Sequence, residues 1–331
     1  MTTIKEVSDL AGVSQATVSR VINGSDRVTE STRNRVRAAM KELGYQPNSA
    51  AQSLASNRSN CFGMVTSELL GPFYGPMMSA VENVLRKNNK HLIIASGHGS
   101  EAQERDAIEY LIGRQVDALI LLTECVDSEY LTELNKRVPV FLINQHVDGL
   151  EDRNMWLDNE GGTYQATRYL INHGHTKIVH VGGQPYKQDA NERVAGFKRA
   201  MSEAKLKVTK DHIVQTRFEF QGGVEGMEVL RKRGIDFTAV VAGNDEEAFG
   251  IMDWADRQGL RVPEDLSVIG FDDILTAHYV KPKLTTMRFP MFEMAETAAQ
   301  AAIDAVYHKK PPIGGEFKLT LVERETVSKR N

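Results

Sequence analysis

From residue 60 onward, short runs of aliphatic and β-branched residues alternate with amphipathic segments, and this alternation limits the folds open to the chain. The strand candidates are FGMVTS, HLIIAS, VDALILL, PVFLIN, KIVHVGG, TAVVAGN and LSVIGFDD. Helical patterns lie between them, for example at residues 77–89, 160–174 and 246–259. Strands that alternate with helices predict parallel sheets with helices on both faces.

Polar residues follow four of the predicted strands: Asn144, Asp158, Asn244 and Asp272. Ligands of such sheets bind beyond the carboxyl ends of the strands, so we expect these side chains to line a binding site. No GxGxxG follows a strand and there is no Walker A sequence, which argues against a nucleotide-dependent enzyme. The histidines of HGH (residues 173–175) have no third ligand nearby, so we expect no metal site and no cofactor.

The composition is that of an ordinary globular protein. Among 331 residues there are two cysteines, without CxxC spacing, which argues against a disulfide framework or a zinc site. No apolar run approaches the roughly 18 residues that span a bilayer, and the first residues lack the apolar core of a signal peptide. We therefore expect a cytoplasmic protein without membrane contact.

The first 46 residues show a purely helical pattern. Ile4, Val7 and Ala11 recur at helical spacing and predict one apolar face. Gly12 permits a tight turn, and the Ser14 hydroxyl can cap the helix that follows. A third helix is expected from about residue 29 to residue 44. This order is the helix-turn-helix plan.

The second helix of this head leaves a polar set facing outward: Gln15, Ala16, Thr17, Ser19 and Arg20. Amide and guanidinium groups can read base edges in the major groove, and hydroxyl groups can bind phosphates. Residues 1–60 carry a net charge of +3 within a chain of net charge −4, so a polyanion would meet only the head. The alternative is a three-helix bundle that binds nothing.

The stretch TIKEVSDLAGVSQATVSRVIN resembles, nearly residue for residue, the DNA-binding head of the lactose/galactose repressor (LacI/GalR) family. The resemblance implies that Gln15, Ala16 and Arg20 read bases, with Ala16 giving an apolar contact. It assigns further DNA contacts to Thr3, Ser14, Thr17, Ser19, Asn23 and Asn48.

The stretch QPNSAAQSLASNRS is similar to the hinge helix of the same family, which folds on the operator and pairs with its twin. Leu54 then matches the leucine that wedges into the minor groove. The alternative is a flexible linker with one incidental leucine.

The remaining chain resembles the same family along its length, through stretches such as TAVVAGNDEEAFGIMDWADRQGLRVPEDLSVIGFDD and PKLTTMRFPMFEMAETA, which look closest to its galactose-repressor branch. The implied fold is that of periplasmic sugar-binding proteins: two α/β lobes with parallel sheets and three crossovers, near Asp158, Met287 and Leu321. The expected domains are a helix-turn-helix head at 1–46, a hinge at 47–59, an N-terminal lobe at 60–158 and 288–320, and a C-terminal lobe at 159–287 and 321–331.

The resemblance places Asn144, Arg193, Asn244 and Asp272 around the effector. A planar guanidinium and carboxylate or amide groups can bind adjacent hydroxyls in pairs. Each residue also has a structural alternative: Arg193 could form a surface ion pair, Asn244 could cap the next helix, and Asp272 could belong to a turn.

Aromatic residues complete the expected site. Phe73 or Tyr74 could offer an apolar face to a sugar ring, although Phe73 could equally be core. Arg217 aligns with a frequent aromatic position of the family, and Phe218 takes that role after a one-residue shift. A cation in the cleft would favour an acidic or phosphorylated ligand, unless Arg217 points outward.

The resemblance implies a homodimeric repressor of sugar-utilisation genes. It would bind a pseudo-palindromic operator in double-stranded DNA and would be released by a small sugar of galactose, galactoside or glucoside type. The alternative keeps the DNA-binding role but makes the ligand a corepressor. A transport-type solute-binding protein and an α/β enzyme are the other classes considered.

Overall fold

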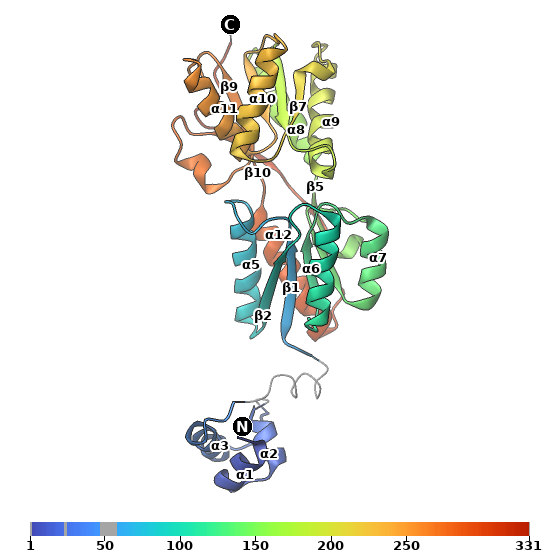
Figure 1. Ribbon diagram of the computed structural model, residues 1–331, viewed down its shortest axis with the longest axis vertical. Helices are drawn as coiled ribbons and strands as arrows, with labels where there is room; N and C mark the ends of the chain where they lie inside the picture. Colours follow the sequence, from blue (N-terminus) through green and yellow to red (C-terminus); the bar gives the residue numbers. More distant parts are fainter. Residues whose placement is uncertain (1, 23–24, 47–57, 331) are drawn as a thin grey trace. The chain divides into compact units, whose positions relative to one another are not determined.

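The computed structural model describes residues 2–22, 25–46 and 58–330, and the chain divides into two compact units, Met1–Ser59 and Asn60–Asn331. The first unit contains α1 (Ile4–Ala11), α2 (Gln15–Ile22) and α3 (Glu30–Glu42), labelled in Figure 1. Its core consists of small apolar side chains: Val7, Ala11, Val18, Val21, Val28, Val36 and Ala39.

The ends of these helices follow from local sequence. The Thr3 hydroxyl accepts a hydrogen bond from the Glu6 N–H while the Glu6 carboxylate accepts one from the Thr3 N–H, a capping box. Gly12 ends α1 with φ +61°, a left-handed conformation that glycine adopts without strain. Thr29 caps α3 through its side chain. The predicted helix-turn-helix is confirmed.

The second unit contains two sheets. The first has the strand order β11-β5-β4-β3-β1-β2, and all its neighbouring strands are parallel. Its strands are β1 (Cys61–Thr66), β2 (His91–Ser96), β3 (Leu119–Leu122), β4 (Val140–Ile143), β5 (Asn154–Leu157) and β11 (Gly315–Phe317).

The second sheet has the order β12-β10-β9-β8-β6-β7 and is parallel except for the pair β10–β12. Its strands are β6 (Ile178–Gly182), β7 (Ile213–Gln215), β8 (Ala239–Ala242), β9 (Ser267–Asp272), β10 (Thr285–Arg288) and β12 (Thr320–Val322). The lobe built on the first sheet is called the N-lobe below, and the lobe built on the second sheet the C-lobe.

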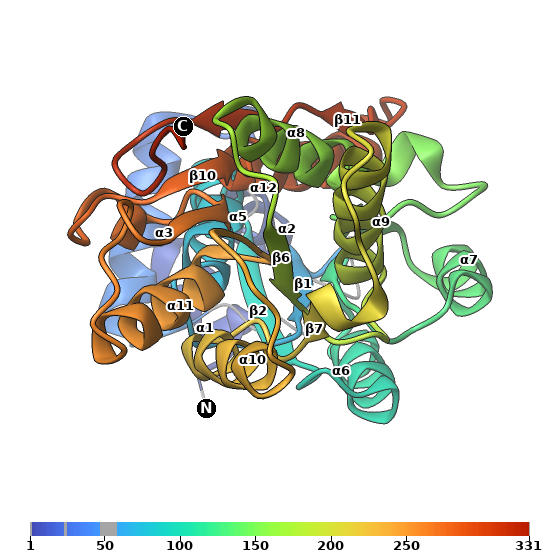
Figure 2. The same ribbon diagram turned by 90° about the horizontal axis from the view of Figure 1, so that it is seen from above.

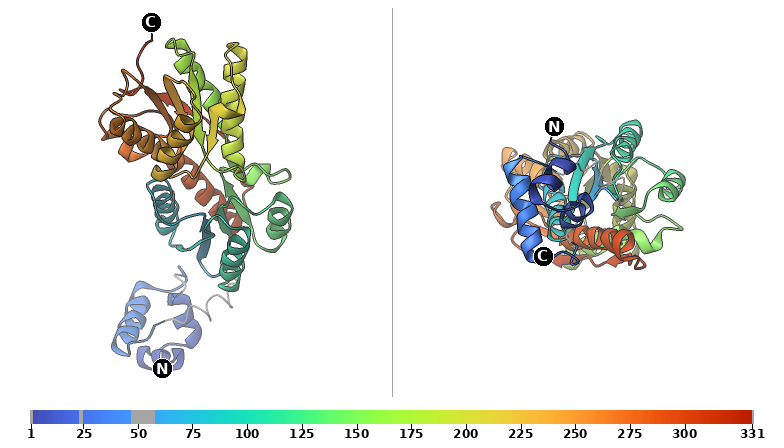
Figure 3. Two further views of the ribbon diagram at one scale, coloured as in Figure 1. Left: turned by 45° about the horizontal axis from the view of Figure 1, so that its top comes forward. Right: turned by 90° about the horizontal axis from the view of Figure 1, so that it is seen from below.

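Helices cover both faces of each sheet. In the N-lobe, α5 (Tyr74–Lys87) packs against α12 (Met291–Ile303), as Figure 3 shows, and the opposite core contains α6 (Glu101–Gly113) and α7 (Ser128–Arg137). In the C-lobe, α8 (Asn159–Asn172) and α9 (Gln188–Glu203) lie on one face, with α10 (Phe220–Lys232) and α11 (Asp245–Arg257) on the other (Figure 2). None of the helices described is long and apolar enough to cross a bilayer.

The chain crosses between the lobes three times. β5 ends at Leu157 before α8, β10 ends at Arg288 before α12, and β11 ends at Phe317 before β12 begins at Thr320. The crossings therefore fall at residues 158, 289–290 and 318–319. The second and third differ by two or three residues from their expected positions, because strands of three or four residues leave little pattern from which to place their ends.

Candidate functional site

The recognition surface of the head lies on α2. Val18 and Val21 are buried in the core of the head, which leaves the opposite side of the helix in solvent. Gln15, Ala16 and Arg20 are all exposed. The structure thus gathers the three expected base-reading side chains on one exposed helix.

Two further predicted DNA contacts also serve the helix ends. The Ser14 Oγ accepts a hydrogen bond of 3.2 Å from the Thr17 N–H, so Ser14 caps α2 as expected. Thr3 caps α1 and is exposed, while Thr17 and Ser19 are half-buried. The predicted contacts Asn23, Asn48 and Leu54 lie outside the described residues.

In the second unit, the predicted polar residues do follow the strands. Asn144 lies directly after β4 and Asp158 directly after β5, whereas Asp272 ends β9 and Asn244 precedes α11. Parallel strands point their carboxyl ends the same way, so the loops of each sheet meet at one edge. The side chains at these facing edges form the surface called the cleft below.

Arg193 is the central cation of the cleft. It lies on α9, its side chain is only 3% exposed, and its guanidinium carbon lies 3.8 Å from the centre of the Phe271 ring. Its Nε and Nη2 both donate to Asn159 Oδ1 at 3.1 Å, and its Nη1 donates to the Gly243 carbonyl at 2.6 Å. These bonds fix the plane of the guanidinium, and the predicted surface ion pair is not what the structure shows.

Asp272 provides a buried oxygen that lacks a donor. Its Oδ1 lies 3.9 Å from Arg193 Nη1 and has no hydrogen-bond partner within the described residues. Burial raises the pKa of Asp272 well above its usual range, against the opposing effect of Arg193. Its φ of +118° is a costly backbone conformation for a non-glycine residue, and such strain is typical of functional sites. A ligand hydroxyl placed here would satisfy this oxygen.

Asn244 serves the fold directly. Its Oδ1 accepts a hydrogen bond of 2.8 Å from the Glu247 N–H, which caps α11, and its Nδ2 donates to the Phe218 carbonyl at 3.2 Å. Both the oxygen and the nitrogen of the Asn244 amide therefore have hydrogen-bond partners within the protein. This is the capping alternative given above.

The first aromatic pair, Phe73 and Tyr74, lies on the N-lobe side of the cleft. Phe73 is half-buried and packs edge-on against Tyr74 and Phe289, with ring centres 5.3 and 5.1 Å apart. The Tyr74 hydroxyl donates to Glu124 Oε1 at 3.4 Å. Burial, and then the negative charge of Glu124 and Asp189, raise the pKa of Tyr74. Of the two rings, Tyr74 carries the polar edge that belongs to the cleft.

The two residues of the second pair, Arg217 and Phe218, differ in their exposure. Arg217 is exposed, whereas the ring of Phe218 is half-buried, with its centre 5.2 Å from Lys187 Nζ and 5.3 Å from the guanidinium carbon of Arg193. Phe218, with the one-residue shift, is therefore the aromatic residue beside the cations of the cleft.

One buried ion pair in the cleft was not predicted. Lys187, which directly precedes α9 of the C-lobe, lies 2.7 Å from the carboxylate of Glu124 in the N-lobe, and the two side chains are 10% and 19% exposed. Burial disfavours the charged amine, but Glu124 and Asp189 outweigh that effect and raise the pKa of Lys187. This pair joins the two lobes directly.

Further polar contacts in the cleft involve the amides of Asn144 and Asn159. The Asn144 amide donates to Asp189 Oδ2 at 3.4 Å, and the Asn159 amide lies 3.3 Å from both Asn144 Oδ1 and Glu192 Oε2. Asp189, Glu192 and Asn159 were also missed by the sequence analysis. Their signal was their position, because they lie in the first five residues of the helices that follow β5 and β6.

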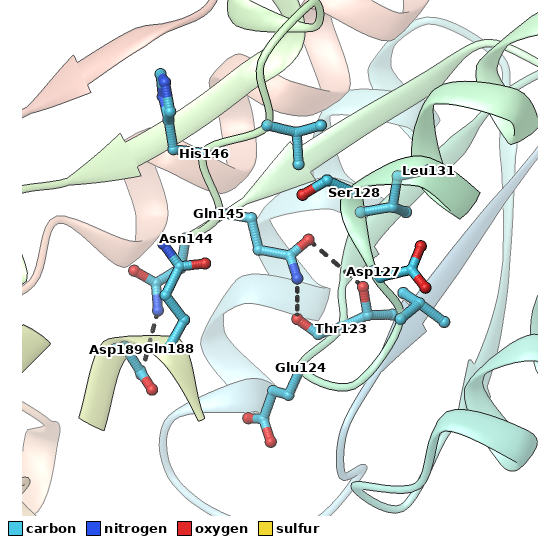
Figure 4. Close-up of a pocket in the computed structure, with 12 residues that line it drawn as sticks. Thr123, Glu124, Asp127, Ser128, Leu131, Asn144, Gln145, His146, Gln188 and Asp189 are labelled. Atoms are coloured by element: carbon cyan, nitrogen blue, oxygen red, sulfur yellow. Dashed lines mark hydrogen bonds between the residues drawn. The ribbon is translucent and has the colours of Figure 1, made fainter. Parts of the chain in front are cut away.

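Two adjoining cavities open here, of about 220 and 300 Å³. Figure 4 shows the first, where the Gln145 amide donates to the Thr123 carbonyl at 2.6 Å. The cavities share Asn144, Gln145, His146 and Gln188. The larger one has the volume of a small-ligand site, about 300 Å³ or more.

Acidic side chains outnumber basic ones around the two cavities. Carboxylates line both cavities: Glu124, Asp127 and Asp189 line the first, and Asp158, Glu160 and Glu192 line the second. Asp272 and the cations Lys187 and Arg193 line neither of these two cavities. Burial raises the pKa of Glu192 as well as that of Asp272. The arrangement offers many oxygen atoms with which the hydroxyl groups of a ligand can form hydrogen bonds.

Comparison with known proteins agrees with this architecture. Residues 3–48 match the family described as bacterial regulatory proteins, lacI family, and residues 167–327 match the periplasmic binding protein-like domain. The HTH-type transcriptional regulator GalR of Escherichia coli (strain K12) is 39% identical over 330 residues, which cover 99% of this chain and 96% of GalR.

Two solved structures give the same result. The lac repressor dimer bound to operator and the anti-inducer ONPF is 25% identical, with a TM-score of 0.88 and 99% of each chain covered. The transcriptional regulator CelR in its cellobiose complex is 30% identical, with a TM-score of 0.73, covering 98% of this chain and 100% of CelR. The predicted head and two-lobed α/β fold are confirmed. The chain belongs to the lacI family of bacterial regulatory proteins and is a DNA-binding transcriptional regulator of the galactose-repressor branch.

Proposed function

We propose that this regulator represses sugar-utilisation genes as a homodimer and that a neutral sugar of galactose, galactoside or glucoside type, bound in the cleft, releases it from its operator. The observation that carries the choice of ligand is the buried pair Arg193–Asp272, whose free carboxylate oxygen and fixed guanidinium suit neighbouring hydroxyls. The proposal places the protein with the chromosome in the cytoplasm. It involves no cofactor and no catalytic step.

The charge of the cleft supports a neutral ligand over a phosphorylated one. Six acidic side chains line the two cavities, and Arg217, the residue that would favour an acidic ligand, is exposed. The aromatic edge of Tyr74 and the ring of Phe218 supply the apolar contact that a sugar face needs. The CelR relative, whose solved complex contains cellobiose, supports the same chemical class.

On the DNA side, α2 would lie in the major groove with Gln15 and Arg20 at base edges. Two copies would bind a pseudo-palindrome whose half-sites are about one helical turn apart. The sugar can release the operator only by binding the released state more tightly than the DNA-bound state.

The test is fluorescence-anisotropy binding to a labelled duplex from the region upstream of the protein's own gene. It is titrated at fixed salt with D-galactose, methyl β-D-galactoside, D-glucose, cellobiose and D-galactose 6-phosphate. We expect specific binding without sugar, weakened by a neutral sugar and not by the phosphate ester. Binding that appears only with sugar would make the ligand a corepressor, and an absence of specific binding would contradict the proposed repressor.

A further inference from the structure

Asn60 is the first residue of the second unit, and it is held from several sides. Its N–H donates to Asp117 Oδ2 at 2.9 Å and its carbonyl accepts from the His91 N–H at 2.9 Å. Its side-chain oxygen accepts from Lys90 Nζ at 2.6 Å and lies 3.2 Å from the Tyr307 hydroxyl. The backbone of Asn60 is thereby fixed at φ +59°. Asn60, Lys90, Asp117 and Tyr307 are called the anchor below.

Tyr307 connects the anchor to several elements of the N-lobe. Its hydroxyl donates to the carboxylate of Asp117, which lies two residues before the start of β3 in the first sheet. Lys90 Nζ lies 3.5 Å from the centre of its ring, and the ring of Phe62 on β1 lies 6.2 Å away. The Asp117 N–H donates to the Cys61 carbonyl at 2.7 Å. The start of β1 is therefore bound to β2, to β3 and to the turn that carries Tyr307.

That turn is the continuation of α12. The helix begins at Met291, directly after the crossover at residues 289–290, and ends at Ile303, where a π-helical turn over Asp304–His308 carries Tyr307. A helix of 13 residues is about 20 Å long. π-helical turns of this kind occur frequently at functional sites.

One end of α12 therefore lies at the interlobe crossover beside the cleft, and its other end lies at the anchor. Phe289 in the crossover is buried and touches Phe73 at the cleft. Met294, Ala298 and Ala302 are fully buried, so the helix cannot move sideways in the lobe without carrying its neighbours.

We propose that the anchor is the positioning element through which α12 converts a change of lobe arrangement at the cleft into a displacement of Asn60, where the effector domain receives the chain from the DNA-binding head. The inference rests on the proposed function. A shift of the crossover moves the start of α12, the buried helix transmits it as a rigid rod, and Tyr307 passes it to Asn60. Tyr307, Asp117 and Lys90 are positioning residues that act through their contacts with Asn60.

The variants Tyr307→Phe and Asn60→Gly test this in the full-length protein. The first removes only the hydroxyl, and the second removes the side-chain acceptor while glycine retains the left-handed backbone without strain. Two quantities are measured: the affinity of the DNA-free protein for D-galactose, or for cellobiose if galactose does not bind, and the ratio of operator Kd with and without saturating sugar.

In both variants we expect the sugar affinity to stay within about 2-fold of the unsubstituted protein, because the anchor lies at the edge of the sheet away from the cleft. The ratio of operator Kd with and without saturating sugar should fall by at least about 5-fold, toward 1. Allosteric coupling typically changes an affinity by about 5- to 150-fold. The matched control is Tyr164→Phe, which removes a similar tyrosine–carboxylate hydrogen bond, 2.7 Å to Glu203. It should leave both quantities unchanged.

A ratio within 2-fold of the unsubstituted protein in both variants would overturn the inference and leave the proposed function standing. A loss of sugar affinity equal to the loss of coupling would also overturn it, because the anchor would then act on the cleft itself. If no sugar changes operator binding by the unsubstituted protein, the proposed function fails, and this inference fails with it.

Discussion

Arg193 uses each of its guanidinium nitrogens on atoms of the protein, which leaves its plane fixed toward Asp272. Lysine keeps the charge but cannot make this planar set of bonds. We therefore expect Arg193→Lys to raise the sugar concentration needed for half-release of the operator by about 10- to 100-fold, equivalent to about 1.5–3 kcal/mol. Operator affinity without sugar should not change.

The matched control is Arg199→Lys on the same helix, where an exposed guanidinium pairs with Glu160. Both variants are compared by anisotropy titration with the same duplex. An unchanged half-release concentration in Arg193→Lys would remove Arg193 from the effector site.

Asp245 should make the stability of the folded protein depend on pH. It is fully buried, and burial raises its pKa to about 7, although hydrogen bonds from the Thr286 hydroxyl and the Ile274 N–H oppose this. The folded protein therefore keeps this proton up to about pH 7, whereas the unfolded chain releases it near pH 4. Since the folded state binds more protons in this window, stability falls as the pH rises through it.

The difference in unfolding free energy between the unsubstituted protein and Asp245→Asn isolates this group from others that titrate in the same range. We expect the difference to fall by about 2 kcal/mol between pH 5 and pH 7. Urea unfolding followed by the fluorescence of Trp156 and Trp254 measures it. A difference independent of pH would show that Asp245 does not hold its proton.

At the level of single residues, the sequence was informative where a side chain follows a strand. Asn144 and Asp272 were predicted at the site in this way, and Arg193 was predicted by resemblance. The pair Glu124–Lys187 was not, because it depends on which loops of the two lobes meet. Asn244 was expected at the effector, and in the structure its side chain caps α11.

Helix α12 is built for close packing, and its alanines show why. Ala295, Ala298, Ala299 and Ala302 are completely buried where the helix meets α5 and the strands of the N-lobe. A larger side chain has no space there, so Ala299→Leu should destabilise the effector domain by about 1–3 kcal/mol. Gln300→Leu, at the neighbouring exposed position, should change stability by less than about 0.5 kcal/mol.

Urea unfolding with tryptophan fluorescence compares the two variants. Equal midpoints would mean that α12 packs loosely, and this would also weaken the argument that it transmits motion as a rigid rod.

The sequence predicted the strands that contain a continuous apolar run. The seven strands expected from apolar runs all exist, and so do the helices over 77–89, 160–174 and 246–259. Five strands were not expected: β5, β7, β10, β11 and β12. They contain three or four residues each and lack the continuous apolar run of the equally short β3, β4 and β8, so their conformation depends on pairing with strands already in the sheet.

The two lobes are held together in part by the buried pair Glu124–Lys187. Removing one partner of such a pair leaves an uncompensated buried charge, whereas exposed pairs contribute little. A double-mutant cycle of Glu124→Gln and Lys187→Met should therefore give a coupling energy of at least about 1.5 kcal/mol.

The same cycle on Glu109 and Arg137, a surface pair 2.7 Å apart within the N-lobe, serves as the control and should give a much smaller coupling. Urea unfolding of the full chain supplies the free energies. Equal coupling in the two cycles would mean that the interlobe pair has no special role in holding the lobes together.

The three crossovers also determine the order in which the molecule can be made. The head is complete once residue 46 has been synthesised, but the N-lobe needs α12 and β11, which end only at Phe317. At about 5–20 residues per second, the roughly 270 residues in between take about 15 to 55 seconds. On every new chain, the head can therefore fold well before the part that senses sugar is complete.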